Sequence, residues 1–415
     1  MVNKLPANWK LKTLSEVGNI ILGGTPDTTK KEYWNGDIWW VIPSEVTSLS
    51  SKYLYDTERK ITELGLKNSS AKIIKPNSLI ICTRATIGNC CINKNEVATN
   101  QGFKSIIPNE DYDVVFLYYL IINNKQKLIS KASGTTFLEI SKTNLANLSF
   151  YFLPLEKQKR IASALSKIDA YLENTIKLIE EKERFKRGIA KKLLTCKEGE
   201  NIPEARFKGF ENEWEIVKLG DIGTITATGV DKKINDNETP IKLLNYLDVF
   251  NRNKLYEKEI SYMTTATEKQ LEKCNIRKGD LFITPSSEDK KGIAKSSVAM
   301  EDFKNMVYSY HIIRVRFNKE IDLKFKSYMC DTDFFHRQAY RLCDGSGQRY
   351  FIKLDNFRNM EICIPKSIKE QEKIGGYLSL LDKEIDNLKK QKELINEMKR
   401  GVMQKLLSGE VRLLE

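Results

Sequence analysis

The feature that most constrains this 415-residue chain is an internal repeat. Near the start of each half, Trp9, Leu14 and Gly18 recur at Trp214, Leu219 and Gly223, an offset of 205 residues. Near the end of each half the offset becomes 213, and the matched positions are Ile161, Leu165, Ile168, Asp169 and Leu172 with Ile374, Leu378, Leu381, Asp382 and Ile385, and Arg187-Gly188 and Leu193-Leu194 with Arg400-Gly401 and Leu406-Leu407. One offset shared by distant landmarks indicates a duplication, so the chain consists of two similar halves.

The interiors of the two halves differ more than their ends. Residues 75–81 align with residues 278–283, but the loops that flank these segments hardly match. A shared scaffold with divergent interiors is what a protein needs in order to read two different targets with one architecture. Ordinary drift after a duplication is the alternative explanation.

Each half closes with a long segment that has the apolar spacing of a coiled-coil seam. The positions that follow this spacing are Ile161, Leu165, Ile168, Leu172 and Ile179 in the first half and Ile374, Leu378, Leu381, Ile385 and Leu388 in the second. The later positions are Phe185, Ile189 and Leu193 in the first half and Ile395, Met398, Val402 and Leu406 in the second. Roughly 35 helical residues extend about 50 Å, so we interpret the helix pair as a spacer. Two ordinary amphipathic helices on a globular core are the alternative.

The interiors contain short runs of Ile, Val, Thr, Tyr and Phe broken by Gly, Asn, Asp and Pro, which is typical of strands. Residues 78–83 and 310–317 are expected to be strands, and residues 114–133 and 323–342 helices. The predicted fold is therefore α+β, with two pseudo-repeated domains that are each followed by a long helix. The expected segments are a first domain (1–155), a first long helix (156–197), a linker (198–213), a second domain (214–366), and a second long helix with a tail (367–415).

Composition narrows the class of protein and its partners. The formal charge of +13, from 68 Lys and Arg against 55 Asp and Glu, favours a polyanionic partner. No run of about 18 apolar residues occurs and residues 1–10 hold no apolar leader core, so we expect a cytoplasmic protein without a membrane segment. The eight cysteines form no C-x-x-C pair and lie mostly in apolar runs, which predicts reduced, buried thiols.

Several loops combine Arg, Gln, Asn and Lys with glycines that permit close approach. Arg can pair with guanine and Gln or Asn with adenine, while Lys pairs with phosphate. The candidate DNA-binding residues are Lys30, Lys31, Arg84, Thr86, Gln101, Lys104, Lys290, Lys291, Gln348 and Arg349. For any single loop, a solvated turn is the alternative.

The sequence lacks the motifs of several enzyme classes. It contains no Asn/Asp-Pro-Pro-aromatic tetrapeptide of adenine methyltransferases and no Gly-x-x-x-x-Gly-Lys-Ser/Thr phosphate loop. We interpret His311 and His336 as structural, because neither has a neighbouring pattern of metal-ligand spacing. Asp280 with the segment Glu288-Asp289-Lys290 resembles a nuclease cluster only weakly.

Several segments resemble the specificity subunits of type I restriction-modification enzymes, and the resemblance extends over essentially the whole chain. They are Gly23-Gly-Thr-Pro26 followed by Tyr33-Trp-Asn-Gly-Asp-Ile-Trp39; the junction Ile202-Pro-Glu-Ala-Arg-Phe-Lys-Gly-Phe210 with Trp214 and Lys218-Leu-Gly-Asp221; and the helix starts Leu155-Glu-Lys-Gln-Lys-Arg-Ile-Ala162 and Lys369-Glu-Gln-Glu-Lys-Ile374. The second half departs from the pattern, since Thr226-Ala-Thr-Gly229 replaces the Gly-Gly-Thr-Pro opening.

The resemblance implies a non-catalytic subunit with two target-recognition domains that read the two parts of a split, asymmetric site in double-stranded DNA. It implies that the long helices form an antiparallel coiled coil that fixes the gap between these parts. It also implies that two methylation subunits bind the chain and supply S-adenosylmethionine, and that motor-nuclease restriction subunits use ATP and Mg²⁺, so this chain itself binds no cofactor. A stand-alone sequence-specific DNA-binding regulator is the alternative, and a nuclease on the same scaffold is a third hypothesis.

Overall fold

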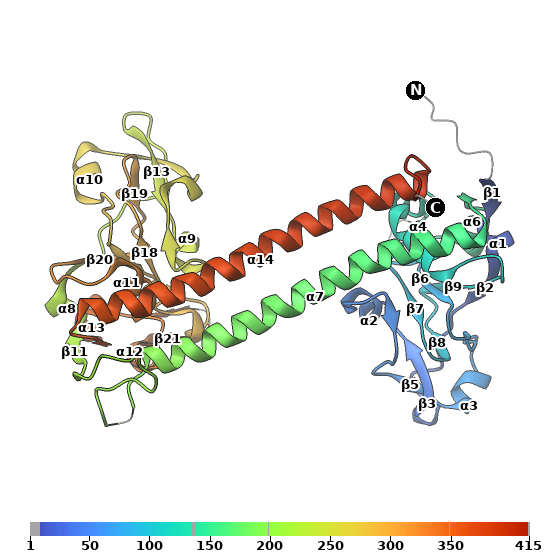
Figure 1. Ribbon diagram of the computed structural model, residues 1–415, viewed down its shortest axis with the longest axis horizontal. Coiled ribbons are helices and arrows are strands. Elements are labelled where there is room, and N and C mark those ends of the chain that lie inside the picture. The colour runs from blue at the N-terminus through green and yellow to red at the C-terminus, as the bar shows by residue number, and fades with distance from the viewer. Residues whose placement is uncertain (1–8, 135–137, 198, 348, 414–415) are drawn as a thin grey trace. The chain divides into compact units, whose positions relative to one another are not determined.

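The computed structural model describes residues 9–134, 138–197, 199–347 and 349–413 (Figure 1). Contacts divide the chain into two compact units. Unit 1 combines the chain up to Leu178 with the segment from Leu388 onward, and unit 2 comprises Ile179–Asn387. Each unit therefore contains one domain together with pieces of both long helices.

Unit 1 contains a five-stranded sheet in the order β2-β9-β6-β7-β4, a three-stranded sheet β5-β3-β8, and the pair β1-β10. The strands are β1 (Lys10–Thr13), β2 (Gly18–Leu22), β3 (Trp34–Val41), β4 (Tyr53–Leu54), β5 (Lys60–Ile61), β6 (Leu79–Cys82), β7 (Cys90–Asn93), β8 (Val97–Thr99), β9 (Phe103–Pro108) and β10 (Ser149–Phe152). The shorter helices are α1 (Leu14–Val17), η1 (Lys31–Tyr33), α2 (Pro43–Ser48), α3 (Glu63–Lys67), α4 (Val114–Asn123), α5 (Lys125–Ile129) and α6 (Lys142–Ala146).

Unit 2 contains a five-stranded sheet β12-β20-β16-β18-β14, a three-stranded sheet β15-β13-β19, the pair β11-β23, and an additional sheet β17-β22-β21. The strands are β11 (Glu215–Lys218), β12 (Gly223–Thr226), β13 (Thr239–Leu244), β14 (Lys254–Leu255), β15 (Met263–Ala266), β16 (Leu281–Ile283), β17 (Ser286–Ser287), β18 (Ser296–Ala299), β19 (Met306–Tyr308), β20 (Ile313–Phe317), β21 (Asp344–Ser346), β22 (Arg349–Phe351) and β23 (Glu361–Ile364). The shorter helices are α8 (Leu219–Ile222), α9 (Tyr246–Phe250), η2 (Glu257–Glu259), α10 (Glu268–Lys273), η3 (Lys290–Gly292), α11 (Leu323–Met329), α12 (Asp333–Leu342) and α13 (Leu354–Asn359).

Apart from the additional sheet β17-β22-β21 of unit 2, the two domains share one topology. In unit 1 the central strand β6 pairs antiparallel with β7 and β9, and β4 joins β7 in parallel. In unit 2, β16 pairs antiparallel with β18 and β20, and β14 joins β18 in parallel. All residues of β6 and β16 are buried, as expected for short apolar runs at the centre of a covered sheet. The duplication and the α+β fold predicted from the sequence are confirmed.

Two helices far longer than the others carry the repeat at the end of each half: α7 (Leu155–Leu194) and α14 (Ile368–Ser408). Within unit 2, Lys182 Nζ lies 2.8 Å from Glu384 Oε2, and Lys186 pairs with Asp382. Residues further along α7 thus contact residues earlier in α14, so the two helix segments run antiparallel. In unit 1 the pairs Asp169–Lys399 and Tyr171–Gln391 show the same direction.

Most positions of the predicted seam are buried, and Ile161 and Leu165 lie in the core of the unit 1 domain, as Ile374 and Leu378 do in that of the unit 2 domain. The buried members are Ile161, Leu165, Ile179, Ile374, Leu378, Leu381 and Ile385, and the half-buried ones are Ile168, Leu172 and Leu388. Two later positions were wrong, because the side chains of Phe185 and Met398 are 52% and 50% exposed. In α14 the buried methionine is instead Met403.

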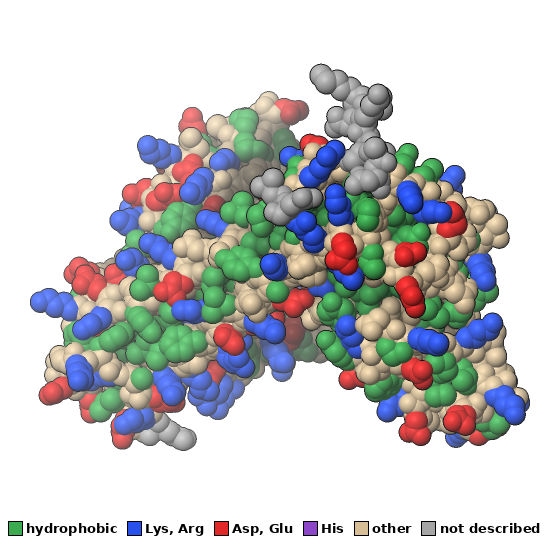
Figure 2. All heavy atoms as spheres, turned by 45° about the vertical axis from the view of Figure 1, so that its right-hand side comes forward, with side chains coloured by type: hydrophobic (Ala, Val, Ile, Leu, Met, Phe, Trp, Pro, Cys, Tyr) green, Lys and Arg blue, Asp and Glu red, His purple; other side chains and the backbone are tan. Residues whose placement is uncertain are grey.

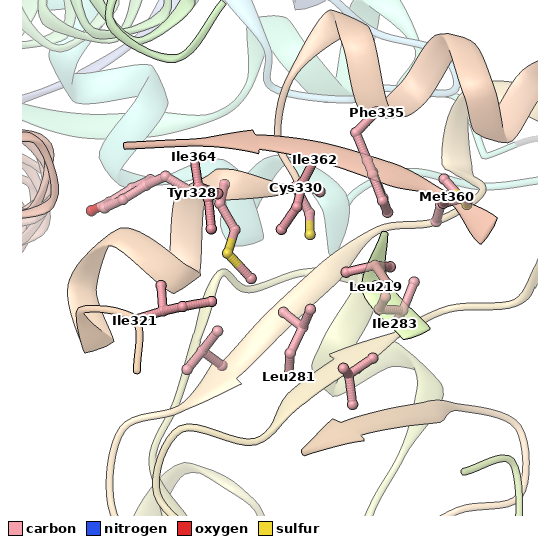
Figure 3. Packing of buried hydrophobic residues seen from close by; sticks show 14 of the residues in the cluster. Leu219, Leu281, Ile283, Ile321, Tyr328, Cys330, Phe335, Met360, Ile362 and Ile364 are labelled. Carbon is pink, nitrogen blue, oxygen red and sulfur yellow. The ribbon is translucent and has the colours of Figure 1, made fainter. Parts of the chain in front are cut away.

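The core of each domain includes leucines from the long helix that belongs to the other half. In unit 2, Leu193 and Leu194 at the end of α7 belong to the core built on β16, β23 and α11. Figure 3 shows side chains of β23 in this core pointing toward those of β16. In unit 1, Leu406 and Leu407 at the end of α14 occupy the corresponding place in the core that contains Phe116. The repeated Leu-Leu pairs therefore have one structural role in both units.

Two helices predicted as continuous are each broken into two. The segment 114–133 forms α4 and α5, because Asn124 leaves helical geometry (φ −110°, ψ 24°) and its side-chain amide caps Leu120 O. The segment 323–342 forms α11 and α12, because Thr332 caps a new helix by accepting a hydrogen bond from Phe335 N. Of the eight cysteines, Cys82, Cys90, Cys91, Cys274 and Cys330 are buried, and Cys196, Cys343 and Cys363 are half-buried.

Candidate nucleic-acid interface

In unit 1, loops from distant parts of the sequence meet where the inner strand β6 ends and its neighbour β9 begins. The loop after β6 contacts the loop after β8, since Thr83 N donates to Gly102 O (2.8 Å). The chain before α6 joins them through Ile140 N, which donates to Thr83 O (3.0 Å). Thr25 reaches the same place, because its hydroxyl donates to Gln101 Oε1. We call the loops that carry Thr25, Arg84 and Gln101 the unit 1 loop cluster.

Glycines make this convergence possible. A Cβ at Gly23 would collide with the carbonyl oxygen of Asn100, and one at Gly24 with the backbone of Ala71. In unit 2 a Cβ at Gly229 would collide with the backbone of Ser309 and Tyr310, in the loop after β19. Gly229 therefore has the same steric role as the glycines of the Gly-Gly-Thr-Pro opening. The second half departs from the family pattern in sequence here, but not in backbone geometry.

The structure separates the candidate residues of unit 1. Arg84 and Gln101 lie together in the loop cluster, with Gly102 packed beside Arg84. Thr86 lies in the same loop, but its hydroxyl is shielded from solvent. Lys30 and Lys31 are exposed at η1, which packs against α3 instead.

Lys104 requires a correction. Its position on β9 turns the side chain inward, where it is 5% exposed. The ammonium donates to Glu139 Oε1 (3.0 Å) and to Thr83 Oγ1 (3.1 Å). Because these contacts hold the loop after β6 in place, Lys104 supports the loop cluster rather than presenting a charge at its surface.

In unit 2 the corresponding loops surround a cavity of about 450 Å³. It is lined by Tyr246, Leu247, Phe250, Ser286, Ser287, Glu288 and Arg349. Arg349 Nη2 donates to Ser286 Oγ (3.4 Å), and the Lys290 ammonium lies 5.3 Å from the centre of the Tyr350 ring. Lys291 is exposed on η3, and Gln348 lies outside the described residues. We call the loops around this cavity the unit 2 loop cluster.

Aromatic and apolar groups on α9 form one wall of this cavity. The rings of Tyr246 and Phe250 are stacked, with centres 5.6 Å apart and planes at 22°. Leu247 beside them is 64% exposed. These residues were not predicted from the sequence, because a mostly apolar segment such as Tyr246–Phe250 indicates core, and only the fold shows that Leu247 is exposed.

Both basic and acidic side chains surround the unit 2 loop cluster, with Arg349 and Glu288 in the lining of the cavity. Burial and the neighbouring charges of Lys232 and Arg349 lower the pKa of His311. On the face shown in Figure 2, basic side chains are interspersed with acidic ones, so the net charge is not gathered in one broad patch there. Local loop chemistry, rather than bulk charge, therefore distinguishes the two clusters.

The weak nuclease-like cluster has a structural explanation. Asp280 is 2% exposed, and Arg316 binds both of its oxygens through Nε (2.8 Å) and Nη2 (2.6 Å). Its carboxylate is thus committed to an ion pair on the sheet. Within the described ranges, no group of three His, Cys, Asp or Glu side chains has the geometry to hold a metal ion, and none of the helices there is long and apolar enough to cross a membrane.

The two loop clusters occupy equivalent places but present different chemistry. Unit 1 offers Arg84 and Gln101, which suit guanine and adenine respectively. Unit 2 offers Arg349 and Glu288 beside an aromatic wall, and these suit guanine and the amino group of cytosine. One scaffold therefore presents two different sets of polar side chains.

Comparisons with known proteins agree with this arrangement. The family described as "Type I restriction modification DNA specificity domain" matches residues 6–181 and 211–397. The MjaIX specificity subunit of Methanocaldococcus jannaschii is 33% identical over 231 residues, which cover 53% of each chain, so this match spans about half the length of that relative. The MjaVIII specificity subunit of the same organism is 24% identical over 99% of this chain and 94% of its own length.

Solved structures share the fold over nearly the full length. The S subunit of a type I restriction-modification system from M. genitalium has a TM-score of 0.55 at 16% identity, covering 98% of this chain and 97% of its own. The HsdS subunit from Thermoanaerobacter tengcongensis has a TM-score of 0.51 at 17% identity, covering 99% of both chains.

Proposed function

Because the chain belongs to the type I restriction-modification DNA specificity family, with one copy of the family domain in each half, we propose that it selects the DNA sequence on which a type I complex acts. In this proposal the unit 1 loop cluster reads one part of a split target and the unit 2 loop cluster reads the other. The target is asymmetric, because the two clusters present different side chains. The observation that carries the proposal is this pairing of one topology with two different loop chemistries.

The proposal assigns different roles to the residues of each cluster. Arg84, Gln101 and Arg349 carry groups that can form paired hydrogen bonds with base edges. Lys290 and Lys291 lie beside the unit 2 cluster and suit phosphate contacts, which set position without reading sequence. The absence of a side chain at Gly23, Gly24 and Gly229 allows the loops to pack closely enough to form the two loop clusters.

Partners supply the chemistry in this proposal. Two methylation subunits bind the chain and hold S-adenosylmethionine, and restriction subunits use ATP and Mg²⁺. The family membership supports this division of labour, as does a sequence without methyltransferase or phosphate-loop motifs. The antiparallel helices α7 and α14 act as the spacer between the two parts of the target.

Methylation mapping tests the proposal directly. Genomic DNA is sequenced for N6-methyladenine in cells that express the partner methylation subunit with this chain, without it, and with a chain in which residues 15–150 come from a relative. We expect a split motif that requires the chain, and we expect the exchange to alter one part of that motif only. A change in both parts would refute the assignment of one part to each unit.

A binding measurement separates this function from a stand-alone regulator. A specificity subunit needs its methylation partner for tight, sequence-specific binding, whereas a regulator binds its site alone. Filter binding or anisotropy with and without the partner distinguishes the two. Full specificity of the isolated chain, together with no chain-dependent methylation, would favour the regulator.

A further inference from the structure

A buried ion cluster joins the domain of unit 1 to the long helices. Asp169 on α7 is 10% exposed on its side chain, and its Oδ2 lies 3.1 Å from Lys52 Nζ and accepts a hydrogen bond from Tyr119 OH (2.5 Å). Its Oδ1 lies 2.6 Å from Lys399 Nζ on α14. The Tyr119 hydroxyl also lies 3.3 Å from Ser166 Oγ. We call Lys52, Tyr119, Ser166, Asp169 and Lys399 the unit 1 clamp.

Unit 2 contains the same cluster. Asp382 on α14 accepts hydrogen bonds from Lys254 Nζ (2.9 Å) and from Tyr328 OH, and it also pairs with Lys186 on α7. The Tyr328 hydroxyl lies 3.2 Å from Ser379 Oγ. We call Lys254, Tyr328, Ser379, Asp382 and Lys186 the unit 2 clamp.

The clamps are duplicated and also exchanged between the halves. Ser166 and Asp169 match Ser379 and Asp382 at the offset of 213 residues. Lys186 and Lys399 are separated by the same offset, yet each lies in the clamp of the other half's domain. Each domain is therefore bound both to its own helix and to the helix of the other half.

Burial makes these clusters a specific means of attachment. Burial by itself would raise the pKa of Asp169, but hydrogen bonds from Lys399 and Tyr119 and the charges of two lysines hold that pKa below its usual value. For Asp382, burial is likewise outweighed by Lys186, Tyr328 and Lys254. A buried carboxylate that loses one of these partners is left uncompensated, so the partners tolerate little displacement. Apolar packing between the same surfaces is non-directional and constrains orientation less.

A second duplicated contact strengthens the attachment. The buried side chain of Gln158, near the start of α7, accepts from Asp113 N (3.0 Å) and donates to Leu153 O (2.7 Å). Gln371, near the start of α14, accepts from Asp322 N (2.9 Å) and donates to Pro365 O (2.8 Å). These contacts fix the helix after the central sheet of each domain at its start, while the clamp fixes that helix further along.

We propose that the clamps are positioning elements for DNA reading, which hold each loop cluster at a set angle and register on the helix pair. This inference rests on the proposed function. Asp169 and Asp382 do not contact DNA in it; they act through the domains that they orient. A weakened clamp should therefore relax the spacing at which the two parts of the target are recognised, rather than change the bases that are read.

The test uses the full chain in complex with its methylation subunits and DNA substrates whose gap is the natural length, one base pair shorter or one longer. The variants are Lys399→Met and Lys186→Met, with Lys399→Arg as the conservative exchange that retains the charge. Lys390→Met, an exposed lysine on the same helix, is the matched control. Thermal unfolding of each complex is recorded beside the methylation rates.

A misplacement of about 1 Å can cost on the order of a hundredfold in rate. We therefore expect Lys399→Met and Lys186→Met each to lower the preference for the natural gap by roughly tenfold, Lys399→Arg to restore it, and Lys390→Met to leave it unchanged. Tyr119→Phe, which removes only one hydroxyl, serves if a lysine variant does not assemble, and it should shift the preference in the same direction. A purely structural role would lower the rates on all three gaps by the same factor.

An unchanged gap preference in Lys399→Met or Tyr119→Phe, with or without a loss of total rate, would overturn the positioning role. A failure of the proposed function is a different result: the wild-type complex would then methylate none of the split substrates, and the clamps would have no reading to position. The methylation rates of the wild-type complex therefore show whether the proposed function or only the positioning role has failed.

Discussion

Removal of the Glu370 side chain tests whether the mid-chain junction Ile202–Phe210 stabilises unit 2 through its contact with α14. Glu370 lies in the first turn of α14 with its side chain 2% exposed, and Arg206 binds it through Nε (2.8 Å) and Nη2 (2.9 Å). Trp214 Nε1 donates to the same carboxylate (3.2 Å). The Ile202–Phe210 segment is thereby tied to the helix of unit 2. Glu370→Ala would leave the indole N–H of Trp214 without this acceptor, and it would leave the guanidinium of Arg206, which also donates to Asn212 O (2.6 Å), without its carboxylate.

The size of the effect follows from burial. Breaking a buried ion pair by removing one partner costs about 3–5 kcal/mol. In a cooperative unit of roughly 200 residues, each kcal/mol shifts the melting temperature by about 2–4 °C. We therefore expect Glu370→Ala to lower the melting temperature of unit 2 by roughly 6–20 °C. Glu370→Gln, which keeps an acceptor but loses the charge, should have a smaller effect.

The assay is differential scanning calorimetry, with domain-specific hydrogen exchange to show which unit opens. The repeat supplies the control, because the position equivalent to Glu370 in the first half is the exposed Lys157. Lys157→Ala should change stability by less than about 0.5 kcal/mol. If Glu370→Ala melts like the wild type, or if Lys157→Ala loses as much stability, the account of the junction is refuted.

Three further predictions concern pH, DNA and oxidation. The pKa values of Asp169 and Asp382 are lowered in the folded protein, so their contribution to stability is complete above the unfolded pKa of about 3.9 and is lost as the pH falls through the lower folded pKa. The free energy of unfolding in urea, measured from pH 6 to pH 2, should therefore fall less steeply with acid in Asp169→Asn than in the wild type. An unchanged slope would contradict this. Arg349→Ala should remove about 1–3 kcal/mol of discrimination at one base pair. Lys291→Ala should instead weaken binding to all DNA sequences and reduce the slope of log affinity against log salt concentration by about 1, and both effects are measured by anisotropy of the complex. Equal losses of affinity on cognate and random DNA for Arg349→Ala would count against base reading. The Sγ atoms of Cys196 and Cys363 lie 2.8 Å apart, and a hydrogen bond from Cys363 lowers the pKa of Cys196, so oxidised glutathione should form a mixed disulfide at Cys196 with release of one reduced glutathione. The Cys363 thiol then displaces the second glutathione and forms the Cys196–Cys363 disulfide. Peptide mapping after alkylation checks this, with Cys343→Ser as control, and full alkylation of both thiols would oppose it.

The sequence predicted the features that depend on periodicity. The apolar spacing of the two long helices predicted where each helix starts to within a residue, since α7 begins at Leu155 and α14 at Ile368. The repeat predicted equivalent domains, and the sheets have the same strand order. Where single polar residues decide, periodicity failed: Asn124 and Thr332 each interrupt an otherwise continuous apolar pattern.

The candidate interface was less predictable, because it depends on which loops the fold brings together. Arg84 and Gln101 were identified by residue type, and the strand order places their loops side by side. Lys104 has the same residue chemistry, but its strand position turns it inward. The role of the clamp lysines was not predicted from the sequence. Their partner Asp169 recurs at Asp382, and an acidic residue repeated within an apolar seam could have indicated that buried basic partners exist.

The exchange of leucines between the halves has a consequence for biosynthesis. A ribosome makes Leu193 and Leu194 before it makes the unit 2 domain that they help to close, so that unit can fold as soon as the chain up to residue 387 has emerged. The unit 1 domain is made first, yet its core waits for Leu406 and Leu407, some 250 residues after its last strand, β10. During translation the first domain should therefore remain incomplete, and open to chaperones, until the second has already folded.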